Sequence, residues 1–285
     1  MSVDDQRLPA QSRRPVALVS GVARPPGIGY ATALLLADAG ADLVCADLVG
    51  SGDTGYASPS TFDAVVADIT ERAARHGGRV VAHHMQSLET PEIAALFSRI
   101  ADSFEGLDWC CVLNGATGPA AGDGPLVELT EESWRRCLDM NLTGSWMLTQ
   151  AAAKVMIESG RGGSLVLLSS HAAIAPTRGA GAVGSARAAV DQLVAILAAE
   201  LGPRGIRVNA VAPLAVEPSE RFPNPALTAL AVNAGMSFEE WIAGRIPLGR
   251  PQQARETAAV IAFLCSEAAS YVSGVTIPVN GGATS

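Results

Sequence analysis

Short apolar runs alternate with segments of helical spacing along this whole chain. The first run is PVALVSG at 15–21 and the last is GVTIPVNGG at 274–282. Strands that alternate with helices pair in parallel, because each helix returns the chain to the edge where the next strand starts. The pattern predicts an α/β fold, a single doubly wound domain with a mainly parallel sheet of about seven strands and helices on both faces.

The domain limits follow from the same pattern, because no change of composition and no internal repeat divides the chain. We expect one domain over 15–285, preceded by a polar, disordered tail over 1–14 that is not a signal peptide. The proline-rich stretch 213–247 is the one long irregular piece. Long loops in compact domains are usually functional, so we expect a lid over a site there, with a plain surface excursion as the alternative.

Charge and cysteine content exclude several classes of protein. The net charge is −8 and no basic stripe offsets it, which argues against a nucleic acid partner. No uninterrupted apolar run reaches about 18 residues, so we expect no membrane span. The five cysteines include no C-x-x-C pair, which favours reduced thiols and a cytoplasmic location. The histidines lack metal-ligand spacing, and we predict no metal site.

A glycine-rich loop, VSGVARPPGIGYA, joins the first strand to the first helix. Glycines at such a turn let the backbone approach a pyrophosphate at the helix N-terminus. Asp47 ends the second strand, where a carboxylate binds ribose hydroxyls and repels a 2′-phosphate. Together these features are typical of a Rossmann-type domain and favour NAD(H) over NADP(H). Arg24 could instead hold a phosphate, and Pro25 and Pro26 have no N–H to donate.

From Val16 to Gly282 the chain resembles the short-chain dehydrogenase/reductase superfamily. The glycine loop, the acid after the second strand, DMNLTGSW and YVSGVTIPVNGG carry this resemblance. The loop holds two residues more than the family pattern, LNGA replaces N-N-A-G, and Gln86-Ser87 replaces Asp-Val. The resemblance implies a cofactor site formed by Ser20, Gly21, Arg24, Gly27, Ile28, Gly29, Asp47, Gln86, Ser87, Asn114, Gly115, Ala116, Arg187 and Pro213.

The catalytic half departs from the family. The family uses a serine and then Y-x-x-x-K on the next helix, with tyrosine as general acid and base. Ser170 matches the serine, but Val183 and Arg187 stand at the tyrosine and lysine positions. The resemblance implies catalytic roles for Ser170, for Arg187 and for Asn141, which matches an asparagine that anchors a relay water. Arg187 can bind ribose but cannot release a proton, so His171 is a candidate replacement acid.

These features favour an NAD(H)-linked oxidoreductase with non-standard proton chemistry that acts on a small, apolar molecule. One alternative is a non-redox enzyme on the same scaffold, such as a lyase, isomerase or cyclase. Another is a catalytically silent homologue that serves as a partner subunit or senses NAD. The resemblance also implies a homodimer or homotetramer through the helices at 131–157 and 183–201, or a hetero-oligomer with an active paralogue.

Overall fold

The computed structural model describes residues 13–50, 58–116, 121–216 and 225–283. Seven parallel strands form one sheet in the order β3-β2-β1-β4-β5-β6-β7, which confirms the predicted fold class. The strands are β1 (Val16–Ser20), β2 (Asp42–Leu48), β3 (Val80–Met85), β4 (Trp109–Val112), β5 (Gly163–Leu168), β6 (Ile206–Pro213) and β7 (Thr276–Val279).

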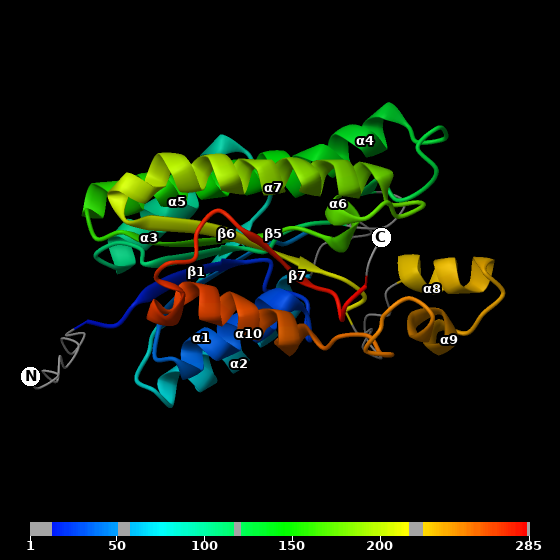
Figure 1. Cartoon of the computed structure of the whole chain (residues 1–285). Coiled ribbons are helices and arrows are strands. Elements are labelled where there is room, and N and C mark those ends of the chain that lie inside the picture. Colours follow the sequence, from blue (N-terminus) through cyan, green and yellow to red (C-terminus); the bar gives the residue numbers. More distant parts are fainter. Residues whose placement is uncertain (1–12, 51–57, 117–120, 217–224, 284–285) are drawn as a thin grey trace, which may run out of the picture.

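Helices cover both faces of the sheet (Figure 1). One face carries α1 (Ile28–Asp38), α2 (Pro59–Ala74) and α10 (Ala254–Cys265). The other carries α3 (Thr90–Ser103), α4 (Glu131–Leu138), α5 (Gly144–Ser159) and α7 (Gly181–Leu201). Three shorter helices, α6 (His171–Ile174), α8 (Pro225–Asn233) and α9 (Phe238–Ala243), lie toward the carboxyl ends of the strands, and 3-10 turns occupy Gly202–Arg204 and Glu267–Ala269.

The strands form because both of their faces are buried. All five residues of β1 are buried, and its side chains alternate between two apolar clusters, one on each side of the sheet. Leu18 packs into the cluster beneath α5 and α7, whereas Val19 packs into the cluster beneath α1 and α10. Continuous apolar strands of this kind are typical of parallel sheets that are covered on both faces.

The structure divides the single long helix that the sequence indicated around 133–156. A π-helical segment, Asp139–Thr143, separates α4 from α5. A π segment inserts one residue into a turn and so shifts the backbone hydrogen-bond pattern. Asn141 lies in this segment, and its carbonyl is directed to a partner outside the helix, as described below.

The stretch 213–247 is less irregular than expected, because α8 and α9 occupy much of its described part (gold in Figure 1). Ser237 and Glu240 form a capping box at the start of α9. Trp241 and Ile242 then pack with Ile246 in a small apolar cluster apart from the main core. Residues 217–224 of the predicted lid lie outside the described residues.

Most of the predicted tail, residues 1–12, also lies outside the described residues. Its last two residues are attached to the domain. Arg13 donates to Asp108 at 2.6 Å, and Arg14 donates from Nη1 to the Gly40 carbonyl at 3.1 Å. Arg13 and Arg14 are therefore bonded to the domain.

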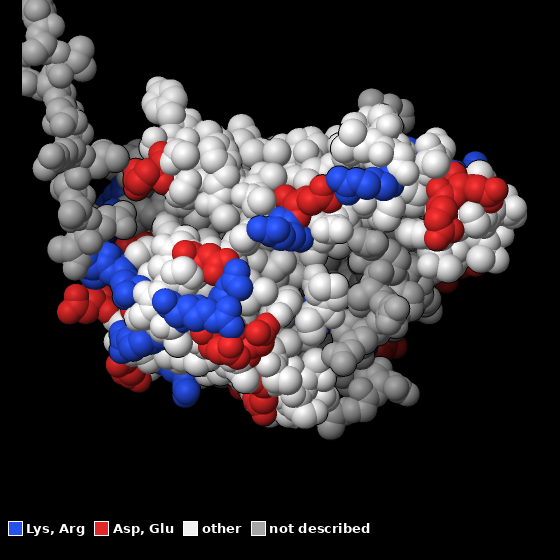
Figure 2. Space-filling model, turned by 90° about the horizontal axis from the view of Figure 1, so that it is seen from below, with Lys and Arg blue, Asp and Glu red and all other residues white. Residues whose placement is uncertain are grey.

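The stretch Gly181–Arg204 is long and apolar enough to cross a membrane by length and composition alone. Most of it is α7, which packs against β6, α6 and α4 and carries a buried arginine. The core helix of a globular fold passes the same test, so the packing accounts for this apolar stretch. Figure 2 shows acidic and basic side chains interspersed on the face that carries α1, α2 and α10, without a continuous basic stripe.

Candidate functional site

The glycine loop is folded tightly against the ends of β1 and β4. Ser20 donates from Oγ to Asn114 Oδ1 at 3.1 Å and accepts from the Leu113 N–H at 3.1 Å, so it joins the two strands. Gly21 has a φ of 78°, in the left-handed region that favours glycine. A Cβ at Gly29 would overlap the Gly21 carbonyl oxygen. These two glycines allow the turn to return the chain into α1.

Asp47 lies beside this loop at the end of β2. Its Oδ2 accepts from the Ala23 N–H at 2.6 Å, and its Oδ1 accepts from the Leu48 N–H at 2.7 Å. Burial raises the pKa of this carboxyl, while the two N–H groups and the charge of Arg24 act in the opposite direction. The carboxyl group is therefore fixed against the glycine loop at Ala23, four residues before Gly27, the N-cap of α1.

This arrangement fits a dinucleotide. The N-terminus of α1 presents unsatisfied N–H groups suited to a pyrophosphate, and Asp47 offers acceptor oxygens to a ribose beside it. Ile28 packs against the apolar core beneath the loop. Gly27 donates its N–H to the Arg24 carbonyl, so that amide is used within the loop.

Five of the predicted cofactor-site residues divide into two groups. The first group, Asn114, Gly115 and Ala116, follows β4, and the Asn114 side chain contacts Ser20 at the start of the glycine loop. Gln86 and Ser87 instead line a cavity of about 970 Å³ with Leu48 and residues from α4 to α5. The Gln86 N–H donates to Glu92 Oε2 at 3.0 Å.

Asn141 joins the π segment to the end of β4. Its Oδ1 accepts from the Ala116 N–H at 3.2 Å, and its Nδ2 donates to the Ala116 carbonyl at 3.1 Å. Asn114 adds a bond from Nδ2 to the Met140 carbonyl at 3.2 Å. The Asn141 side chain is thus fully occupied with backbone, and its own carbonyl faces α7.

Arg187 of α7 lies in the middle of this network and is 3% exposed. Its Nη1 donates to the carbonyls of Asn141 at 3.2 Å and Leu168 at 2.6 Å. Its Nη2 donates to the Asn114 carbonyl at 3.0 Å. Burial lowers the pKa of Arg187 to about 10, which leaves the guanidinium charged at neutral pH. The guanidinium therefore ties three backbone segments together, which occupies donors that the sequence assigned to a ribose.

Val183, at the position expected to hold the proton donor, is also turned into the protein. It packs in a small apolar cluster with Cys137 and Ala182, next to Leu129 and Trp134 of the α4 region. Its side chain is buried. Val183 is therefore packed among apolar side chains, and the Arg187 guanidinium is bonded to backbone carbonyls.

Ser170 and His171 lie next to this network because β5 ends at Leu168. Ser170 caps α6 by accepting from the Ala172 N–H at 3.2 Å, which leaves its own O–H hydrogen free to donate. His171 is the first residue of α6. Side chains alternate between faces along a strand, but β5 has already ended here, so Ser170 and His171 need not point to opposite faces.

Asn280, which the sequence analysis did not single out, determines the proton position on His171. The Asn280 Oδ1 accepts from the Gly282 N–H, and its Nδ2 donates to the Ala283 carbonyl, which fixes the orientation of the amide. The same Nδ2 lies 3.3 Å from His171 Nδ1, which must therefore accept. Nε2 then carries the proton. Burial lowers the pKa of His171 and favours this neutral form.

His171 lines a cavity of about 780 Å³ between α6 and the α8–α9 segment. Leu214, which directly follows Pro213 at the end of β6, lines it as well. The proline-rich stretch thus supplies one wall of a cavity that reaches a candidate site residue. Within the described ranges, no group of three His, Cys, Asp or Glu residues could hold a metal ion.

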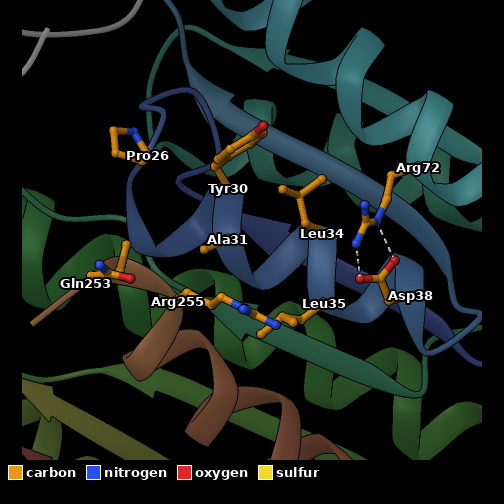
Figure 3. Close-up of a pocket in the computed structure, with 10 residues that line it drawn as sticks. Pro26, Tyr30, Ala31, Leu34, Leu35, Asp38, Arg72, Gln253 and Arg255 are labelled. Atoms are coloured by element: carbon orange, nitrogen blue, oxygen red, sulfur yellow. Dashed lines mark hydrogen bonds and ion pairs between the residues drawn. The ribbon is translucent and has the colours of Figure 1, made fainter. Parts of the chain in front are cut away.

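Another cavity, of about 540 Å³, lies on the outer side of α1, between α1, α2 and α10 (Figure 3). Neither Ser170 nor His171 is among the described residues that line it. Its polar groups are largely used by the protein, because Arg72 donates to both carboxylate oxygens of Asp38 at 2.5 and 2.7 Å. Tyr30 donates to Asp68. We do not assign the reaction to this cavity.

Known proteins resemble this chain over nearly its whole length. A family model described as enoyl-(acyl carrier protein) reductase matches residues 21–284. An uncharacterized NAD-dependent oxidoreductase of Mycobacterium tuberculosis is 31% identical over 94% of this chain and 95% of its own length. A cis-4-hydroxycyclohexanecarboxylate dehydrogenase of Sinomonas cyclohexanicum is 34% identical over 94% and 96%.

Among solved structures, a carveol dehydrogenase from Mycobacterium avium in complex with NAD superposes with a TM-score of 0.81 and 26% identity, covering 94% of this chain and 96% of that chain. The sheet order, the glycine loop with its carboxylate and these full-length similarities agree with one another. The chain therefore belongs to the short-chain dehydrogenase/reductase superfamily.

Proposed function

We propose that this protein is an NAD(H)-dependent oxidoreductase that acts on a carbonyl or alcohol of a small, largely apolar molecule. The observation that carries the proposal is the Asp47 carboxylate, which the Ala23 N–H holds beside the glycine loop. A carboxylate in that place accepts from ribose hydroxyls and repels a 2′-phosphate, which favours NAD(H) over NADP(H). The NAD-dependent relatives support the same choice.

The nicotinamide cofactor, when bound, supplies or accepts the hydride. The protein's task is to stabilise the charge that develops on the substrate oxygen. Ser170 retains a free O–H hydrogen, and the tautomer of His171 places an N–H on Nε2. Both are neutral hydrogen-bond donors at the same edge of the sheet. We assign them to the substrate oxygen.

Neither donor is a good source of a proton. A neutral imidazole that loses its Nε2 proton would become an anion, and a serine hydroxyl is a still weaker general acid. Arg187 is bound to three carbonyls and holds its charge. We therefore assign the proton to solvent water. Without a positioned general acid, we expect turnover to be about 10²–10⁴-fold slower than with one.

A catalytically silent, NAD-binding partner is the second candidate. Its support is that Val183 lies in an apolar cluster and that Arg187 is committed to backbone carbonyls. Exposed Trp146 on α5 and Ile196 on α7 offer apolar surface for a homodimer, a homotetramer or a complex with an active paralogue. A cytoplasmic location would suit the reduced, buried cysteines under either candidate.

Calorimetric titration of the purified protein with NAD, NADH, NADP and NADPH tests the proposal. We expect NAD and NADH to bind more tightly than the phosphorylated pair, and carbonyl compounds then to oxidise bound NADH slowly. Binding without turnover would favour the silent partner. Turnover of a substrate with no change in nicotinamide absorbance would instead indicate a lyase, isomerase or cyclase. No binding of any dinucleotide would overturn all of the NAD-based assignments.

A further inference from the structure

The cavity beside His171 has an unusual balance of charge for this protein. The chain as a whole carries a net charge of −8. Among the described residues that line this cavity, Arg178 and Arg245 are charged, and no Asp or Glu is present. By contrast, Asp38 lies among the residues that line the cavity outside α1, together with Arg72 and Arg255 (Figure 3).

The two arginines lie at the solvent side of the cavity, since both are exposed whereas His171 is buried. Neither has an ion-pair partner among the described residues. Arg245 is held in place by Trp241, with its guanidinium carbon 4.4 Å from the centre of the indole ring. A cation stacked on an aromatic face keeps its outer N–H groups free for a ligand.

The rest of the wall is mostly apolar, with Thr177 and Asn233 as its other polar side chains. Ala175 and Pro176 come from the segment after α6, Leu214 follows β6, and Trp241, Ile246 and Pro247 come from α9 and the residues that follow it. Trp241 and Ile246 are themselves buried in the small cluster of that segment. The cavity therefore combines an apolar body, two cations at the outer end and a neutral N–H donor at the inner end.

We propose that this cavity binds an apolar carboxylate, with the carboxylate near Arg178 and Arg245 and the apolar body against Leu214, Trp241 and Ile246. A guanidinium binds a carboxylate through paired N–H bonds, which a neutral group of the same shape cannot replace. The inference deepens the proposed function, because it places the reacting oxygen of the substrate toward His171 and the acid group away from it. Binding itself does not require the cofactor.

The test is calorimetric titration of the full-length protein, without cofactor, with 2-naphthoate and with 2-naphthamide. The two compounds share a shape but differ in charge. We expect the carboxylate to bind at least about tenfold more tightly than the amide. The variant with Arg178→Gln and Arg245→Gln should lose this preference, whereas Arg245→Lys, which keeps the charge, should retain most of it. Arg255→Gln, in the cavity outside α1, is the matched control and should leave the preference intact.

Equal binding of the two compounds, or no binding of either, contradicts the proposal, as does a preference that survives removal of both arginines. Thermal unfolding of each variant shows whether a loss of binding reflects a loss of fold. The outcome is separable from that of the proposed function. Naphthoate selectivity without NAD binding would support the cavity proposal and reject the oxidoreductase. NAD-dependent turnover without naphthoate selectivity would support the oxidoreductase and reject the cavity proposal.

Discussion

The nucleotide half and the catalytic half of the site use their polar groups in opposite ways. In the first, the Asp47 carboxylate accepts two backbone N–H bonds and still has acceptor capacity at the edge of the glycine loop. In the second, Arg187 gives its donors to the carbonyls of Asn114, Asn141 and Leu168, and Val183 is packed among apolar side chains. The nucleotide half leaves acceptor atoms of Asp47 available to a ligand. In the catalytic half, the side chains of Val183 and Arg187 point into the protein.

The difference shows how a polar side chain at a predicted site position can serve the packing of the fold, since Arg187 is bonded to backbone carbonyls of three segments. The planar guanidinium presents several N–H donors in one rigid group and reaches all three carbonyls. The π segment helps, because it turns the Asn141 carbonyl toward α7. Under the proposed function, the hydrogen bonds to the substrate oxygen come from Ser170 and His171 instead.

The largest effect on stability should come from a substitution of Arg187, whose side chain points into the protein. We expect Arg187→Met to lower the free energy of unfolding by about 3–5 kcal/mol, because it removes the guanidinium hydrogen bonds to three backbone carbonyls in the interior. Urea unfolding followed by circular dichroism measures this change. Arg204→Met, at an exposed arginine on the 3-10 turn after α7, is the control and should have almost no effect. A loss for Arg187→Met no larger than the control would show that the guanidinium is not structural.

Restoring the family's tyrosine should also cost stability. Val183→Tyr adds a ring to the cluster of Cys137 and Ala182, and overpacking of this kind costs about 1–3 kcal/mol. We expect no gain in turnover, because Arg187 remains bound to backbone. Thermal unfolding and a nicotinamide absorbance assay measure the two quantities. A rise in turnover of more than about tenfold would mean that the inner half is closer to a working site than its packing indicates.

A substitution of Asp47, in the nucleotide half, should change the affinity for the cofactor rather than the stability of the fold. Asp47→Asn should weaken NAD binding about tenfold, or about 1.4 kcal/mol, and should change NADP binding less. Titration calorimetry measures both affinities. Asp102→Asn, at an exposed carboxylate on α3, is the matched control. If both variants bind NAD as the parent protein does, Asp47 is not a ribose ligand.

The smallest effect concerns pH. Burial lowers the pKa of His171 below its ordinary value of 6.5. The imidazole of His171 therefore binds a proton more readily in the unfolded chain than in the folded chain. Stability should therefore fall as pH drops below about 6.5, and the loss should level off once pH is below the folded-state pKa. His171→Gln keeps an acceptor for Asn280 and should show a weaker dependence. His83, whose pKa is also lowered, is present in both proteins and cancels in the difference. If the free energy of unfolding depends on pH in the same way in the parent protein and in the His171→Gln variant, His171 is not the group responsible.

The order of strands and helices could be read from the sequence because each element carries its own periodicity. The sheet, the glycine loop and the place of Asp47 followed from local patterns and spacing. The π segment could not be predicted, since DMNLTGSW continues the helical spacing on both sides. The helices α8 and α9 were hidden by the prolines around them, although Ser237 and Glu240 spell a capping box.

The direction of individual side chains was the part that the sequence could not supply. Whether Arg187 faces a ribose or a set of carbonyls depends on the Asn141 carbonyl, 46 positions earlier in the chain. The tautomer of His171 depends on Asn280, 109 positions later. Arg178 and Arg245 become a pair through the cavity that both line. Each of these relations is made by the tertiary fold and leaves no local pattern.

The bonds of Arg187 have a consequence for assembly. They connect α7 directly to the π segment between α4 and α5, and Asn114 extends that connection to Ser20 at the mouth of the glycine loop. If two copies of the chain associate through α5 and α7, the contact surface and the cofactor loop share one rigid set of bonds. Thermodynamic linkage then requires that a dinucleotide which tightens association be bound more tightly by the associated form, by the same factor. In such an assembly Arg187 would connect the cofactor loop of one subunit to the surface that contacts its neighbour.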